Sequence, residues 1–373
     1  MSYKCEIIAD SFSPQGNRLT TFLVTYPRII HAEMLRHRMF SRNTASSRAI
    51  PFAKMVKDVI ENPFIPITWQ KDHKGMQGTE YFTDDLSVQF ARSNWLTARD
   101  NAVKGAMSLH STENGYGSVT KQLCNRLLEP FVWTTELITT SEEGLMNFFD
   151  LRCPRYTFNH EYDDTKTTAV YKSWKDVIYR NDGVENWTLL QKFNINQSQA
   201  EIHIQRIAEM MWDAYNESKP KQLKSGEWHI PDLGHSWGKE QLSKINDMNK
   251  FLDFFQFGEC VHKVSEDILK LKLKISTAHC AKISYNNFGK GVDYEADIKL
   301  HDRLLIQGHM SPFEHCAKAM SDEEYASYVK GKLMVDSDDG YYTIEGPSMD
   351  EKLEGGWCRN FKGFIQYRHL IEK

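Results

Sequence analysis

The pattern of hydrophobic and polar positions at the start of the chain predicts a β-hairpin. The segment CEIIADSF has the composition of a strand, the residues PQGN after it are typical of a turn, and residues 19–26 are rich in β-branched side chains. Pro27 ends the second strand and suits the first turn of a helix. Because the following RIIHAEMLRHRMF is rich in helix formers, we expect a helix over residues 28–40.

Apolar residues at helical spacing predict several further helices along the chain. Ser118 is a good N-cap for one that Pro130 interrupts. The other expected helices cover residues 84–110, 141–152, 198–215, 247–272 and 293–308.

Three segments lack a clear period and connect or decorate these elements. Residues 51–85 contain several prolines and glycines, so we expect a loop there. Residues 154–197 are polar and aromatic, which indicates an inserted surface excursion. Residues 217–245 carry the Pro, Gly and Ser expected of a connection between two halves.

Composition and charge narrow the class of protein. The 373 residues are 40% hydrophobic with a negative mean hydropathy, and no run of about 18 apolar residues or export signal occurs, so we expect a soluble cytoplasmic protein with no membrane partner. A net charge of −4 argues against broad nucleic-acid binding. The seven cysteines are widely spaced without a CxxC pair, which favours reduced thiols over a zinc site.

One short stretch concentrates positive charge in this slightly acidic chain. Residues 36–49, RHRMFSRNTASSRA, hold four arginines, one histidine and four serines or threonines. On a helix, Arg36 and Arg38 would point about 200° apart and could hold two different anionic groups. Glu33 would share the face of Arg36 and could pair with it or contact a ligand.

The end of this stretch offers a second set of donors. Ser46, Ser47 and Arg48 place hydroxyl groups beside a guanidinium, which suits a phosphate and a planar ring. Taken alone, the stretch is equally compatible with a solvated basic helix end followed by a Ser/Thr-rich turn.

The spacing Arg-His-Arg, seven residues, Ser, one residue, Arg resembles the signature of the flavin-dependent thymidylate synthases. Four more segments resemble motifs of that family: NRLLEP, GLMNFFDLR, HCAKISY and GHMSPFEH. The last precedes the Arg-His-Arg motif in the family and follows it here, so the chain resembles a circular permutant. The expected organisation is then a nucleotide- and flavin-binding segment with insertions, a connection and a permuted segment within one composite domain, over residues 1–216 (insertions 51–117 and 154–197), 217–245 and 246–373.

This resemblance implies an α+β fold, with a mixed sheet and flanking helices, in a homotetramer. It implies methylation of dUMP to dTMP, with FAD as cofactor and with methylenetetrahydrofolate and NADPH as cosubstrates. Arg152 would polarise the pyrimidine where negative charge develops. The residues implied to surround the nucleotide are Glu33, Arg36, Ser46, Ser47, Arg48, Arg126 and Arg152. Those implied to lie along the flavin are His37, Arg38, Asn43, Asn147, His309, Ser311 and Glu314.

Departures from the family pattern leave two alternatives open. Glu33 stands where the family carries Gln; since a carboxylate only accepts hydrogen bonds, it could favour the 4-amino group of cytosine, and the substrate could be dCMP, methylated or hydroxymethylated. Ser141 and Glu143 replace a flavin-contacting Asn-x-Arg, so the chain could instead be a nucleotide-binding protein without flavin. An RNA-binding module is disfavoured by the acidic charge balance.

Overall fold

The predicted N-terminal hairpin is confirmed. In the computed structural model, β1 (Lys4–Phe12) and β2 (Arg18–Pro27) pair antiparallel, with Lys4 opposite Thr25 and Phe12 opposite Arg18. The structure describes residues 2–74, 78, 80–113, 115, 117–162, 165–181, 183–231, 261–285, 293–328 and 355–372.

The hairpin forms the middle of a five-stranded sheet with the order β3-β4-β2-β1-β7. The other strands are β3 (Ser41–Thr44), β4 (Trp133–Ser141) and β7 (Lys221–Gln222), and only the β1–β7 pair of this sheet is parallel. The sequence interpretation assigned no strand to β3 or β4. Threonine and β-branched residues dominate β4, a composition typical of a strand.

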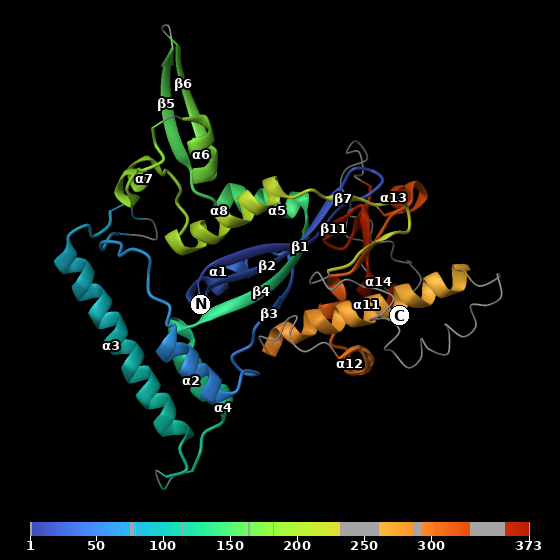
Figure 1. Cartoon of the computed structure of the whole chain (residues 1–373), viewed down its shortest axis with the longest axis horizontal. Coiled ribbons are helices and arrows are strands. Elements are labelled where there is room, and N and C mark those ends of the chain that lie inside the picture. The colour runs from blue at the N-terminus through green and yellow to red at the C-terminus, as the bar shows by residue number, and fades with distance from the viewer. Residues whose placement is uncertain are drawn as a thin grey trace, which may run out of the picture.

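Helices cover both faces of this sheet (Figure 1). Three of them were expected and span Glu142–Arg152 (α5), Ile202–Glu217 (α8) and Val261–Lys282 (α11). Phe22, Val24 and Tyr26 of β2 pack with α5 and α8 in the main core. Leu23 of β2, pointing to the other face, packs near the residues that end α11. Successive residues of a strand point to opposite faces of the sheet, so β2 contributes side chains to two separate hydrophobic cores.

The expected helix over residues 28–40 is wrong. A 3₁₀ turn, η1 (Arg28–Ile30), leads into the short α1 (His31–Met34), and the chain then turns. The amide of Arg36 donates to the carbonyl of Glu33 over 3.2 Å, which marks a tightening turn. The chain turns here because β3 must return to pair with β4. Arg36 and Arg38 therefore do not project from opposite faces of a helix.

The loop expected over residues 51–85 contains a helix, α2 (Phe52–Glu61). Met55 and Val59 lie one turn apart and are buried, so the amphipathic pattern prevailed over the prolines that flank it.

The neighbouring helices follow the prediction more closely. Helix α3 (Asp85–His110) is confirmed, and Asp84 caps it by accepting from the amide of Ser87. The next helix was placed too early: α4 (Lys121–Cys124) is capped by Thr120 instead of Ser118, and η2 (Asn125–Phe131) continues it through Pro130.

The excursion expected at 154–197 stands out from the body of the molecule (Figure 1) and has regular structure of its own. Tyr156, Trp174, Val177 and Val184 form a separate hydrophobic cluster there. This inserted unit contains β5 (Tyr156–Tyr162), β6 (Thr165–Tyr171), α6 (Trp174–Arg180) and α7 (Leu189–Ile195).

The C-terminal part adds small sheets and helices next to β3 and β4. Helix α12 (Tyr294–Ile306) agrees with the expected 293–308 and precedes η5 (Ser311–Glu314). Of the helix expected over 247–272, residues 247–260 lie outside the described residues, and α11 continues ten residues beyond its expected end, to Lys282. Within the described ranges, no helix is long and apolar enough to cross a membrane. The remaining elements are β8 (Trp228–His229), β9 (Ala317–Ala319), α13 (Asp322–Ser327), β10 (Trp357–Cys358), β11 (Phe361–Lys362), β12 (Phe364–Gln366) and α14 (Tyr367–Ile371).

Candidate functional site

The turn after α1 and the end of α5 bring three of the predicted site residues into contact. Arg152, the last residue of α5, donates from Nε to Nε2 of His37 over 3.1 Å. Its terminal nitrogen lies 3.4 Å from the carboxylate of Glu33. These partners are 115 and 119 positions from Arg152 in the sequence. The fold therefore joins the two segments on which the expected nucleotide site depends.

The charges in this cluster hold Arg152 in a defined orientation. Burial, followed by the charges of Arg152 and Arg42, lowers the pKa of His37 to about 4, so the imidazole is neutral at pH 7. A neutral ring that accepts at Nε2 carries its proton on Nδ1. Burial raises the pKa of Glu33, as does Glu201, whereas Arg152 and Arg36 oppose that rise.

Six predicted site residues keep their side chains free at the surface. All six are exposed, and none forms a side-chain hydrogen bond or close ion pair with another described residue. Guanidinium, imidazole, amide and hydroxyl groups in this state can all be directed to a bound molecule. They are Arg36, Arg38, Arg126, Asn147, His309 and Ser311.

Segments from the C-terminal third pack directly against the Arg-His-Arg turn. The side-chain amide of Asn360 donates to the carbonyl of Met39 over 2.8 Å and to Oγ of Ser41 over 3.1 Å. Asn43 is buried, and its side chain donates to the carbonyl of Cys280 over 3.1 Å. Asn43 thus holds α11 against β3.

Two acidic residues near this contact are paired. Lys362 lies 3.1 Å from the carboxylate of Glu143, so the acidic charge noted at this position in the sequence has a cation beside it. Glu314 accepts a hydrogen bond from Arg368.

The second half of the basic stretch lies in a different environment. Oγ of Ser47 donates to the carboxylate of Glu129 over 2.6 Å. Arg48 donates to the side chain of Gln122 over 3.3 Å. The amide of Ser46 donates to the carbonyl of Ser284 over 3.0 Å. Ser47 and Arg48 therefore have protein partners for their side chains, and Ser46 has one for its backbone amide.

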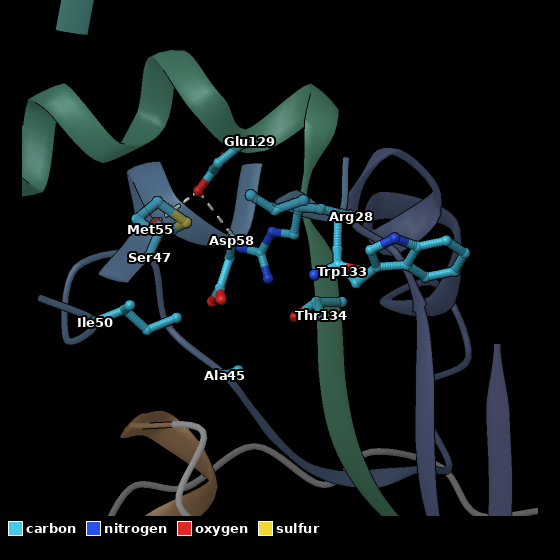
Figure 2. Close-up of a pocket in the computed structure, with 11 residues that line it drawn as sticks. Arg28, Ala45, Ser47, Ile50, Met55, Asp58, Glu129, Trp133 and Thr134 are labelled. Carbon is cyan, nitrogen blue, oxygen red and sulfur yellow. Dashed lines mark hydrogen bonds and ion pairs between the residues drawn. The ribbon is translucent and has the colours of Figure 1, made fainter. Parts of the chain in front are cut away.

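Ser47 also borders a small cavity of about 110 Å³, shown in Figure 2. Arg28 enters this cavity and lies 3.9 Å from Glu129, while Asp58 of α2 adds a second carboxylate. Two carboxylates against one guanidinium disfavour a phosphate here. To bind a phosphate, Ser47 would have to give up its bond to Glu129.

The sequence interpretation did not include a buried acid on β4, between β2 and β3 of the sheet. Glu136 of β4 is fully buried and accepts from the hydroxyls of Tyr26, over 2.6 Å, and Thr44, over 2.7 Å. Tyr26 also meets Nδ1 of His31 at 2.8 Å. Burial raises the pKa of Glu136. The only sequence signal is a lone acid within an otherwise apolar and threonine-rich strand.

Within the described ranges, no group of three or more His, Cys, Asp or Glu side chains could hold a metal ion. All six cysteines of the described part are free thiols.

Comparison with known proteins identifies no family for this chain. No family model matches the sequence, and no curated protein matches it. Two crystal structures of the UMP/dUMP methylase PolB from Streptomyces cacaoi are similar to it in part. The structure bound with 5-Br dUMP has 15% identity and a TM-score of 0.38, covering 58% of this chain and 91% of the other. The structure bound with 5-Br UMP has 17% identity and a TM-score of 0.37, covering 58% and 89%. Likeness at this level carries no argument about function.

Proposed function

We propose that this protein is a flavin-dependent enzyme that methylates dUMP to dTMP, with methylenetetrahydrofolate as the carbon donor and NADPH as the reductant. The observation that carries the proposal is the contact of Arg152 with His37 and Glu33. It joins the Arg-His-Arg turn to the end of α5, the two segments in which the sequence most resembles the flavin-dependent thymidylate synthases.

In this proposal Arg152 acts on the pyrimidine. Neutral His37 accepts one guanidinium N–H and Glu33 accepts another, so the guanidinium plane is fixed before substrate binds. A fixed cation stabilises negative charge on the ring carbonyl, and this enolate-like charge makes C5 able to attack the one-carbon unit. Arg36, exposed beside Glu33, is free to bind the phosphate.

The exposed donors among the predicted flavin residues fit the chemistry of FAD. Arg38 would bind the diphosphate, and Asn147, His309 and Ser311 offer neutral groups to the ring system and ribose. Lys362 offsets the charge of Glu143, so this acid does not oppose a diphosphate. Bound reduced flavin would supply the hydride that completes the methyl group.

The absorption spectrum of the purified protein tests the cofactor. We expect a flavin spectrum, either directly or after incubation with FAD and gel filtration. A colourless protein that takes up no FAD but binds dUMP in a calorimetric titration would contradict the proposal and favour the nucleotide-binding alternative.

A second candidate substrate, dCMP, is favoured by the Glu33 carboxylate beside Arg152. The carboxylate can accept from the 4-amino group of cytosine, whereas it would repel the 4-keto oxygen of uracil. Glu33→Gln should then shift the ratio of kcat/KM for dUMP over dCMP at least about tenfold toward dUMP. An unchanged ratio would remove this candidate.

A further inference from the structure

Helix α8 has a second face that the main core does not use. Its residues at spacings of three and four, from Ile202 to Glu217, border a groove of about 690 Å³ beneath the inserted unit. The opposite wall is formed by α6 and α7, which lie above α8 in Figure 1. The volume is within the range of small-molecule sites, which is about 300–1,000 Å³.

Fixed contacts keep this groove open. Glu209 of α8 accepts from the backbone amide of Trp174 over 2.8 Å. The indole N–H of Trp212 donates to Asp176 of α6 over 2.9 Å. Both contacts join α8 to the inserted unit. The walls are therefore positioned before any molecule enters.

Most charges in the groove are neutralised within the protein. Lys175 pairs with Glu217 over 2.5 Å, and Arg206 pairs with Glu209 over 3.0 Å. These pairs leave no net charge from four of the six charged side chains that line the groove. The other two charged side chains must therefore provide the electrostatic recognition of a ligand.

Those two are a lysine and an aspartate of opposite walls. Lys192 of α7 has its ammonium 4.5 Å from the centre of the Trp174 ring and, among the described residues, no carboxylate partner. Asp213 of α8 is half-buried and forms no close ion pair within that same part of the chain. Burial raises the pKa of Asp213 and Glu209 raises it further, whereas the Ser173 hydroxyl and the more distant ammonium of Lys175 lower it. Both groups would gain from a partner of opposite charge.

We propose that this groove binds a small zwitterion with a bulky apolar body, such as a free aromatic amino acid. Its ammonium pairs with Asp213 and its carboxylate with Lys192. Its side chain lies against Ile178, Leu189 and Phe193, apolar residues of the α6–α7 wall. A plain anion would meet Asp213, and a plain cation would meet Lys192, so only a molecule with both charges satisfies the groove. The site does not depend on the proposed methylation.

Calorimetric titration of the full-length protein with three probes tests this site without any mutation. L-Phenylalanine carries both charges, phenethylamine lacks the carboxylate, and 3-phenylpropionate lacks the ammonium. We expect phenylalanine to bind at least about tenfold more tightly than either analogue, since each loses one charge-assisted contact. Equal affinities, or no binding of phenylalanine at millimolar concentration, would overturn the proposal.

Two variants test which side chain binds the carboxylate of the ligand and which binds its ammonium. In Lys192→Met, phenylalanine and phenethylamine should bind within about twofold of each other, because the carboxylate has lost its partner. In Asp213→Asn, phenylalanine and 3-phenylpropionate should converge in the same way. Lys270→Met, an exposed lysine on α11, is the matched control and should retain the full preference. Retention of that preference in Lys192→Met would contradict the assignment.

Discussion

The two halves of the Arg-rich stretch lie in opposite electrostatic environments. Around the turn at residues 36–38, the three guanidiniums of Arg36, Arg38 and Arg152 outnumber the two carboxylates of Glu33 and Glu201. Around residues 46–48, by contrast, Ser47 faces a cavity with two carboxylates and one guanidinium. A sequence motif identifies residues, but it does not show which side chains they contact in the folded protein. We therefore expect an anion at the first half, whereas the side chains of Ser47 and Arg48 in the second half bond to protein partners.

Replacing Arg152 should have the largest effect on the first region. Arg152→Lys retains the charge but loses the two-sided hold by His37 and Glu33, so we expect kcat for dUMP methylation to fall about 100- to 1,000-fold. Arg155→Lys, an exposed arginine three positions later, is the control and should stay within about twofold of the original rate. A wild-type rate in Arg152→Lys would show that this region is not the reaction site.

The sequence predicted the elements whose signals are local. The hairpin carries its own turn, and α3 carries its own cap at Asp84, so neither needs distant partners. The helix expected over 28–40 failed because its end is set by the pairing of Thr44 with Glu136, 92 positions away. No local pattern reports such a pairing. The helix α2 could have been found, because Met55 and Val59 have helical spacing.

The same distinction applies to the candidate site. The Arg-His-Arg spacing pointed to Arg36 and His37, and the α5 motif to Arg152. The sequence could not show that Ser47 donates a hydrogen bond to Glu129, because that bond spans 82 positions and depends on how η2 packs. Partner choice is a tertiary property, so the sequence indicates candidate donors but not which of them stay free.

Removing the Ser47 hydroxyl tests whether the second half of the stretch stabilises the fold or binds the nucleotide. Ser47→Ala leaves the Glu129 carboxylate without its hydroxyl donor, so we expect the free energy of unfolding to fall by about 1.5–3 kcal/mol in urea titrations. Affinity for dUMP should change by less than about threefold. If affinity falls tenfold while stability is unchanged, Ser47 binds the nucleotide and the second region has been misassigned.

Acidification should affect the first region before the second. Burial, followed by nearby arginines, lowers the pKa of both His31 and His37 to about 4, whereas an opened chain would titrate near 6.5. As pH falls from 6.5 toward 5, the opened state gains protons and the folded state does not, so stability is lost in that window. Allowing for solvent screening, we expect about 1 kcal/mol per histidine by pH 5.

Hydrogen exchange at pH 7.5 and pH 5, corrected for intrinsic rates, measures the loss of stability separately in each segment. Protection should fall around residues 31–40 more than around residues 45–50, which contain no histidine. An equal loss in both segments would show that the two regions open as one unit.

The most direct test of the account is release of tritium from 5-labelled dUMP by the FAD-loaded protein with methylenetetrahydrofolate and NADPH. We predict release that depends on all three additions and is lost in both Arg36→Gln and Arg152→Lys. If neither labelled dUMP nor labelled dCMP releases tritium, or if release persists unchanged in both variants, the guanidiniums gathered at this turn do not act on a pyrimidine nucleotide.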